Sequence, residues 1–294
     1  MNSLAGKRLV VFGCGYVGAA VARWGDAAGL KVTALTRNPA TALLLREVGL
    51  STVVADLAGS AWHDDIPGEP EFAVDCVSSG GGGVEAYRRS YVGGMESILG
   101  WARAKGRIGT LVYTGSTSVY PQGDGARVDE TMPATARNER AQLLLDTEAR
   151  LAAAGEAVGR RFILRLAGIY GPGRHHLLEQ VKAGAISGFG QHHLNLIHRD
   201  DIVDAIAACL AAPATVANEV INLADDGAAT KAEIVRWLAS TLGVVEPTFT
   251  GEPAEGRGMG TPDRVIVNRK AKALLGWKPR YPTFREGYAK LLSR

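Results

Sequence analysis

Short apolar runs alternate with amphipathic helical segments through the first two hundred residues of the 294-residue chain. The runs show little polar–apolar alternation, which is typical of strands in a parallel sheet whose two faces are both covered by helices. We predict strands at residues 8–13, 31–36, 52–55, 72–77, 109–115 and 161–166. We predict helices between them, notably at 84–105 and 137–154. This order indicates an α/β fold built on a doubly wound parallel sheet, which binds ligands at the carboxyl ends of its strands.

The final third of the chain has a different pattern. Helical segments near 200–212 and 230–242 are separated by the run Val220–Leu223, and short segments with proline and glycine follow. We therefore expect residues 1–170 to form the domain that contains the sheet. Residues 171–294 are expected to form mainly a smaller lobe, interleaved with the sheet, that covers its ligand-binding edge.

A glycine-rich turn follows the first apolar run, with glycines at Gly13, Gly15 and Gly18, and a helical pattern comes directly after it. This strand–turn–helix unit is typical of sites that hold the pyrophosphate of a dinucleotide. Gly13 permits the tight turn, Gly15 lets a phosphate approach the backbone, and Gly18 lets the helix pack closely on the strand. The free N–H groups and the positive dipole end of the helix then face the phosphates. A flexible glycine loop is the alternative, and the strand before the turn and the helix after it favour the nucleotide site.

The ends of the second and third strands indicate which dinucleotide is bound. A carboxylate at the end of the second strand commonly binds the adenosine ribose hydroxyls, and here the chain has Thr36 and Arg37 instead. A guanidinium fork matches a 2′-phosphate, so we expect NADP(H) in preference to NAD(H), unless Arg37 simply points into solvent. Asp56, after the third strand, could accept the adenine amino group or could cap a local turn.

Small and hydroxyl-bearing residues end the fourth and fifth strands. Val77 and Ser78 would lie under the nicotinamide ribose and the pyrophosphate, whereas Thr114 and Ser116 could bind polar ligand atoms or only form turns. The residues expected to contact the coenzyme are Gly13, Gly15, Tyr16, Val17, Gly18, Thr36, Arg37, Asp56, Leu57, Val77, Ser78 and Thr114.

The composition restricts the class of partner. Hydrophobic residues make up 46% of the chain and charged residues 21%, as in ordinary globular enzymes. The net charge of +3 is small, so we expect no nucleic-acid partner. No stretch reaches the ~18 uninterrupted apolar residues that a membrane span needs. The three cysteines, Cys14, Cys76 and Cys209, are too scattered for a disulfide framework or a zinc site, so we expect no metal and a cytoplasmic location.

Several longer segments carry a family resemblance in the order in which they occur. They are the glycine turn, Ser116–Tyr120, Arg165–Arg174, Ile197–Ile202, Asn222–Asp225 and Leu275–Pro279. In these segments the chain resembles the extended short-chain dehydrogenases/reductases of the NAD-dependent epimerase/dehydratase type, over nearly its whole length. The resemblance implies a Rossmann-type dinucleotide-binding domain at 1–170, a smaller C-terminal substrate lobe, and Ser116 as the catalytic serine. It also implies a homodimer formed through the two long helices, although the apolar side chains there could equally be ordinary core.

The chain departs from the central pattern of that family, a tyrosine followed four residues later by a lysine. In this pattern the lysine and the oxidised nicotinamide lower the pKa of the tyrosine, which then moves the substrate proton. The register set by Tyr120 and Glu148 puts Arg140 at the tyrosine position and Leu144 at the lysine position. No tyrosine of the sequence precedes a lysine by four residues, so the usual general base is missing.

Histidines are chemically suited to replace that base, because their pKa lies near neutral pH. His175 and His176 directly follow the Tyr-Gly-Pro-Gly-Arg turn at the expected ligand edge, and we predict that one of them is the base. Each could instead have only a surface or packing role. Together with Ser116, the residues expected at the substrate are Tyr170, Arg174 and Arg199.

The two arginines could neutralise a phosphate or carboxylate of the substrate, and Arg199 could equally pair with a neighbouring aspartate. We expect an NADP(H)-dependent oxidoreductase of the epimerase/dehydratase type, with NAD as the other coenzyme considered, that transfers a hydride on a small polar or sugar-derived substrate. The alternative is a protein that binds the coenzyme without turnover, as a sensor or scaffold. The missing tyrosine and lysine favour the alternative, whereas the retained Ser116 and Arg165 favour an enzyme.

Overall fold

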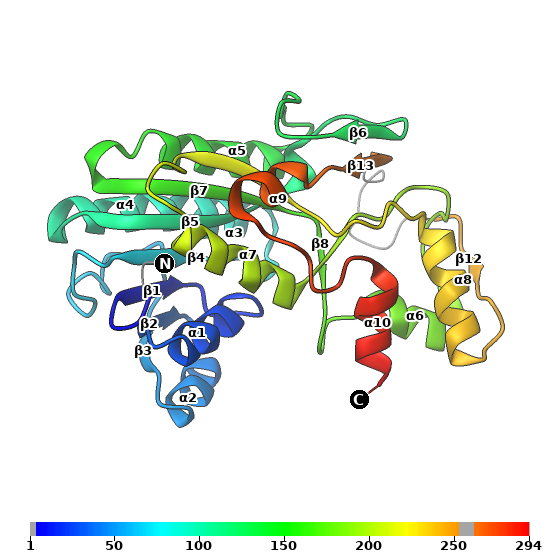
Figure 1. Ribbon diagram of the computed structural model, residues 1–294, viewed down its shortest axis with the longest axis horizontal. Helices are drawn as coiled ribbons and strands as arrows, with labels where there is room; N and C mark the ends of the chain where they lie inside the picture. The colour runs from blue at the N-terminus through cyan, green and yellow to red at the C-terminus, as the bar shows by residue number, and fades with distance from the viewer. Residues whose placement is uncertain (1–3, 253–261, 294) are drawn as a thin grey trace.

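A computed structural model describes residues 4–252 and 262–293. Its centre is a seven-stranded sheet in which all neighbouring strands are parallel (Figure 1). In spatial order the strands are β11 (Glu219–Leu223), β7 (Val158–Leu166), β5 (Ile108–Ser116), β4 (Phe72–Asp75), β1 (Arg8–Phe12), β2 (Lys31–Thr36) and β3 (Ser51–Val54). The order reverses between β1 and β4, which is where doubly wound sheets bind their ligands. The predicted fold class is confirmed.

Helices cover both faces of the sheet. On one face α1 (Gly18–Ala27) packs against α7 (Arg199–Ala211), and on the other α4 (Gly94–Lys105) packs against α5 (Glu139–Ala152) (Figure 1). Strand β1 shows why the sequence from Leu9 to Phe12 is apolar at every position. Leu9 and Val11 belong to the core beneath α1 and α7, whereas Val10 and Phe12 belong to the core beneath α4. Alternate side chains of a strand point to opposite faces, so a strand covered on both faces needs apolar residues at every position.

The predicted helix at 84–105 is divided into three parts. It begins as α3 (Gly83–Tyr87), widens into a π-helical turn at Arg88–Gly93 and continues as α4.

Next to the sheet edge, α2 (Pro39–Glu47) begins with a proline at its first position and with Asn38 as its cap. The Ala40 N–H donates to the Asn38 side chain at 2.9 Å, which satisfies one of the free donors of that helix start.

The remaining elements lie mostly at one end of the molecule (Figure 1). They include the helices α6 (His176–Lys182), α8 (Lys231–Leu242), α9 (Arg269–Leu275) and α10 (Phe284–Leu292). They also include three parallel strand pairs, which are β6 (Ala126–Val128) with β13 (Arg264–Ile266), β8 (Gly168–Tyr170) with β10 (Leu196–His198), and β9 (Ala185–Ile186) with β12 (Thr248–Phe249). A separate apolar core holds α6, α8 and α10 together around Tyr170.

The chain forms part of this end of the molecule and then returns to the central sheet to add its last strand. Strand β11 lies far along the chain, beyond α6 and α7, and pairs in parallel with β7 at the edge of the sheet. Within the described residues, none of the helices combines the length and the apolar character that crossing a membrane requires.

Candidate active site

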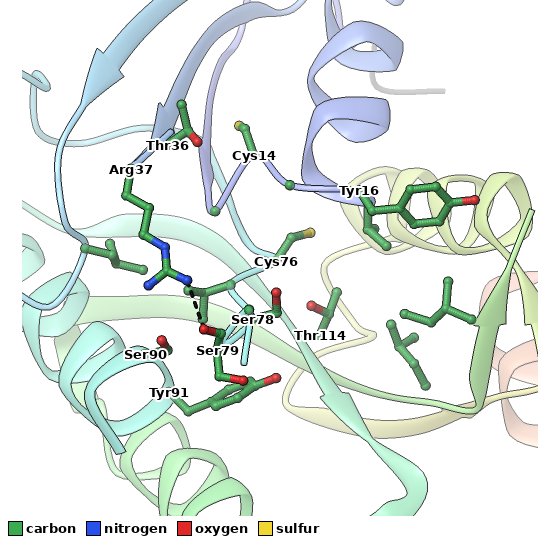
Figure 2. Close-up of a pocket in the computed structure, with 18 of the residues that line it drawn as sticks. Cys14, Tyr16, Thr36, Arg37, Cys76, Ser78, Ser79, Ser90, Tyr91 and Thr114 are labelled. Carbon is green, nitrogen blue, oxygen red and sulfur yellow. Dashed lines mark hydrogen bonds between the residues drawn. The ribbon is translucent and has the colours of Figure 1, made fainter. Parts of the chain in front are cut away.

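A cavity of about 620 Å³ opens at the carboxyl ends of the central strands (Figure 2). Most of the residues that the sequence predicted at a coenzyme or substrate contribute to its lining. These are Gly13, Gly15, Tyr16, Val17, Thr36, Arg37, Asp56, Leu57, Val77, Ser78, Thr114, Ser116 and Arg174. The structure therefore gathers residues from β1, β2, β4 and β5 around one space, as a parallel sheet requires of its strand ends.

The three glycines of the first turn have three different surroundings. A Cβ atom on Gly13 would lie 2.6 Å from the Cα atom of Val77, and one on Gly18 would lie 2.4 Å from the carbonyl oxygen of Gly13. Both positions are therefore closed to any side chain. A Cβ atom on Gly15 would meet nothing within 4 Å, and Gly15 lines the cavity. Gly13 and Gly18 allow close packing of the turn, whereas Gly15 leaves backbone open to a ligand.

Helix α1 begins at this turn without a side-chain cap. No described side chain accepts a hydrogen bond from its first N–H groups, and its first turn holds no acidic residue. By contrast, Asn138 caps α5 and accepts a hydrogen bond from the Ala141 N–H at 2.9 Å. Uncapped N–H groups and a positive dipole end suit a negatively charged ligand.

Arg37 lines the cavity, and its side chain is both exposed and held by a hydrogen bond. Its guanidinium Nη2 donates to the carbonyl oxygen of Ser79 at 2.9 Å, and Figure 2 shows the side chain reaching from the end of β2 to the loop after β4. A Cβ atom on Gly80 would lie 2.7 Å from the same Nη2. The glycine after Ser79 thus leaves room for the guanidinium at the cavity wall.

Asp56 caps a local turn and pairs with a cation. Its Oδ1 accepts a hydrogen bond from the Ala58 N–H at 3.0 Å, and its Oδ2 lies 2.7 Å from Nη2 of Arg89. Burial acts to raise the pKa of this carboxyl, but the hydrogen bonds from Arg89 and Ala58 outweigh it and lower the pKa. The turn-capping role that the sequence left open is therefore present, and Asp56 lines the cavity as well.

Thr114 and Ser116 end β5 in different ways. The Thr114 hydroxyl is buried and donates to the backbone oxygen of Asp75 at 3.0 Å, which ties β5 to β4. The Ser116 hydroxyl oxygen accepts the Ser118 N–H at 3.1 Å and lines the cavity. This bond fixes the direction of the Ser116 side chain and leaves its O–H proton for a ligand oxygen.

Comparison with known proteins shows to which family the chain belongs. The family model for the NAD dependent epimerase/dehydratase family matches residues 9–224. The chain belongs to this epimerase/dehydratase family. It is 30% identical to protein YeeZ of Escherichia coli (strain K12) over 193 residues, which are 65% of either chain. It is 28% identical over 215 residues to a 3-diazoavenalumate denitrifying reductase of a Streptomyces species, covering 66% of this chain and 68% of the relative.

A solved structure extends the likeness of fold to the full chain. UDP-glucuronic acid 4-epimerase from Bacillus cereus, determined in complex with NAD, superposes with a TM-score of 0.77 at 18% identity. The superposition covers 98% of this chain and 100% of that one. At this identity the likeness shows the shared fold, which is that of the epimerase/dehydratase family.

Helix α5 holds the two positions that the sequence register assigned to the tyrosine and the lysine. Leu144, at the predicted lysine position, is buried and lines the cavity. Arg140, at the predicted tyrosine position, is exposed, with its guanidinium carbon 5.2 Å from the ring centre of Tyr87. Further along the helix, Glu148 forms a buried two-point ion pair with Arg165, at 2.6 and 3.0 Å. This pair attaches α5 to β7 and fixes how Leu144 faces the cavity.

Tyr16 brings together the two arginines predicted at the substrate. The guanidinium carbons of Arg174 and Arg199 both lie near this ring, 5.5 and 5.3 Å from its centre. Arg174 lines the cavity, whereas Arg199 lies outside the lining and pairs with Asp200 at 2.9 Å. The ion-pair alternative for Arg199 is therefore present.

The remaining predicted residues lie away from the cavity lining. His175 stands before α6, 3.1 Å from a carboxylate oxygen of Glu179, and His176 is exposed and hydrogen-bonds Gln180 at 2.9 Å. Tyr170 is buried in the second core, where its ring packs 5.0 Å from that of Tyr288. Burial raises the pKa of Tyr170. Gly18 acts through the packing of the turn.

Sequence reasoning missed several residues that line the cavity on the helices beside the sheet. These are Tyr87, Ser90 and Tyr91, together with Asn38 and Thr41 at the start of α2. The signal for the first three was available, because Tyr87 and Tyr91 are four residues apart in the helical segment that directly follows the fourth strand. Side chains with that spacing face the same way, and here they face the carboxyl end of the sheet.

Proposed function

We propose that the protein is an NADP(H)-dependent oxidoreductase that transfers a hydride on a small polar or sugar-derived substrate. Membership in the epimerase/dehydratase family supports an NAD(P)-dependent enzyme. The Streptomyces relative, a reductase by name, supports it too and favours an enzyme over a sensor or scaffold without turnover.

The first turn fits the pyrophosphate of such a coenzyme. The space beside Gly15 is open, and any Cβ atom there would enter the cavity where a phosphate would approach. The uncapped start of α1 supplies N–H donors and a positive dipole end to the same place. When bound, the coenzyme supplies the hydride, or accepts it in the reverse direction.

Arg37 carries the preference for NADP(H). The end of β2 holds Thr36 and Arg37, so no carboxylate of β2 would repel a 2′-phosphate there. The nearest acid along the cavity wall, Asp56, is already paired with Arg89. The Arg37 contact with Ser79 is a single bond to a neutral carbonyl oxygen, and a doubly charged phosphate is a stronger partner for a guanidinium.

The substrate would lie between Ser116 and Arg174, both of which line the cavity. Ser116 would donate its O–H to the reacting oxygen and hold the substrate in position. Arg174, held by its stacking on Tyr16, would face a phosphate or carboxylate of the substrate.

The family resemblance also leads us to propose a homodimer through α4 and α5. Leu143 and Leu144 are buried and Leu145 packs against the core, so the apolar side chains of α5 are used within one chain. The dimer thus rests on the resemblance, and sedimentation velocity would test it. The cytoplasmic location stays a prediction from cysteine usage.

The preference for NADP(H) is tested by Arg37→Ala. Loss of the charged contact should weaken NADPH binding by about 1–3 kcal/mol and leave NADH binding nearly unchanged. Arg46→Ala is the matched control, because Arg46 also donates to one carbonyl oxygen, that of Thr52, but lies outside the cavity. Both affinities are measured by fluorescence titration or calorimetry. An equal loss for both coenzymes in Arg37→Ala would contradict the assignment.

Turnover is tested separately with NADPH and a panel of carbonyl compounds and nucleotide sugars. Oxidation of NADPH that Ser116→Ala abolishes, while NADPH affinity is kept, would support the enzyme. Tight NADPH binding without oxidation across the panel would support the sensor instead.

A further inference from the structure

Hydride transfer to a carbonyl compound needs a group that gives a proton to the oxygen, and the cavity limits the choice. The two arginines of the lining keep their protons at any working pH. The other described lining residues with a titratable proton are Cys14, Tyr16, Asp56, Cys76, Tyr87 and Tyr91.

Three of these six groups lie beside the proposed coenzyme site, at the ends of the strands β1, β3 and β4. Cys14 and Cys76 flank the glycine turn (Figure 2), and burial raises the pKa of both thiols, that of Cys14 to about 12. Asp56 stands at the end of the third strand and is paired with Arg89. The pKa of Asp56 is lowered, so this carboxyl holds no proton to give near neutral pH.

Burial affects two of the three tyrosines. The Tyr16 hydroxyl is buried beside Gly171, where a Cβ atom would lie 2.8 Å from it. Burial raises the pKa of the Tyr91 phenol.

Tyr87 remains, and its surroundings suit proton transfer. It is half-buried at the end of α3 and lines the same cavity as Ser116. Its ring centre is 5.0 Å from that of Tyr91 and 5.2 Å from the guanidinium carbon of Arg140. The next residue, Arg88, lies 3.1 Å from a carboxylate oxygen of Glu139 at the start of α5.

We propose that Tyr87 is the residue that gives the substrate oxygen its proton, with Arg140 stabilising the charge left behind. The inference deepens the proposed function and rests on it. In the reducing direction the substrate carbonyl carbon accepts a hydride, with its two electrons, from the nicotinamide coenzyme. The π electrons of the C=O bond move to the oxygen, which takes the hydroxyl proton of Tyr87. The tyrosinate then regains a proton from water.

In the proposed arrangement the phenol and the cation come from two different helices. The resemblance implies a phenol and a cation that both come from α5. Here α5 supplies the cation, Arg140, at the tyrosine position, and α3 supplies the phenol. The arginine is permanently charged, so it can face a developing tyrosinate without a proton of its own to lose.

The test compares Tyr87→Phe with Tyr91→Phe as its matched control, since each removes one hydroxyl group from the same wall. Tyr87→Phe should lower kcat by about 10²–10⁴-fold with the affinity for NADPH unchanged, whereas Tyr91→Phe should cost about tenfold or less. Arg140→Gln should lower kcat with KM nearly unchanged, because it acts on the charge that develops during the reaction. In the coenzyme-free protein, nitration by tetranitromethane should modify Tyr87 faster than Tyr91, and NADP should slow the modification of Tyr87.

Two results overturn different claims. Wild-type protein that binds NADPH but turns over no carbonyl compound would refute the proposed function, and the role of Tyr87 with it. Wild-type turnover that Tyr87→Phe retains within about twofold would refute the role of Tyr87 alone. Nitration of Tyr87 at a rate that NADP does not change would also refute it, because the residue would not face the coenzyme cavity.

Discussion

The side chain of Tyr16 ends where a side chain on Gly171 would begin: a Cβ atom on Gly171 would lie 2.8 Å from the Tyr16 hydroxyl oxygen. Tyr16 belongs to the glycine turn after β1, and Gly171 belongs to the Tyr-Gly-Pro-Gly turn after β8. Two segments far apart in the chain therefore meet at one point. Gly171 also has a φ of 145°, a conformation that other residues rarely adopt. The contact joins the coenzyme turn to the segment that presents Arg174.

Gly171→Ala should therefore destabilise the protein by about 1–3 kcal/mol, because the new methyl group overlaps the Tyr16 hydroxyl. Urea unfolding measures the loss. Gly173→Ala is the control for backbone strain, since Gly173 has a φ of 73° and a Cβ atom there would meet nothing within 4 Å. Adding Tyr16→Phe to Gly171→Ala should restore part of the loss. A Gly171→Ala variant no less stable than Gly173→Ala would contradict the contact.

Gly15→Ala and Gly18→Ala should separate binding from folding. At Gly15 the added methyl group enters open space in the cavity, so coenzyme affinity should fall while the urea midpoint stays the same. At Gly18 it would lie 2.4 Å from the Gly13 carbonyl oxygen, so stability should fall by about 1–3 kcal/mol. Calorimetry and urea unfolding of both variants give the four values. Unchanged coenzyme affinity in Gly15→Ala would rule out pyrophosphate binding at this turn.

The strands could be predicted because a sheet covered on both faces leaves a continuous apolar signal. All six predicted strands are present, and the largest shift is in β7, which begins at Val158. The seventh strand, β11, was not assigned, because its run follows α7 in a part of the chain whose composition indicated the second lobe. The helix at 84–105 was predicted whole, yet it contains the π-helical turn next to the cavity.

The coenzyme side of the site was easier to predict than the substrate side. Strand ends meet at one edge whatever their sequence separation, so Thr36, Arg37, Thr114 and Ser116 could be grouped from the strand order alone. The substrate side depends on the course of the Tyr-Gly-Pro-Gly turn. That turn brings Arg174 onto Tyr16 and then starts α6, which takes the following histidines away from the lining.

The carboxyl of Asp75 should make stability depend on pH. The side chain is fully buried at the end of β4 and accepts the Val77 N–H at 3.0 Å, and burial raises its pKa from 3.8 to about 7. The folded protein therefore holds this proton more tightly than the unfolded chain does. The associated stability is complete below pH 3.8 and is lost as the pH rises to about 7.

Asp75→Asn should remove this dependence, since the amide oxygen can still accept the Val77 N–H and carries no charge. Between pH 5 and pH 8 the wild type should lose about 3 kcal/mol relative to the variant. Urea unfolding at both pH values gives the difference. Contributions from other buried acids, such as Asp225, are present in both proteins and cancel. A difference between the two proteins that stays constant with pH would show that Asp75 is ionised in the folded state.

The position of β11 has a consequence for how the protein is made. Until Glu219–Leu223 has left the ribosome, one edge of β7 has no partner strand, although most of the sheet is already synthesised. An uncovered edge of this kind readily pairs with other chains. A fragment that stops at residue 170 would carry every residue of the glycine turn and still be prone to aggregate. The nascent chain therefore needs β11 before the edge of β7 is covered.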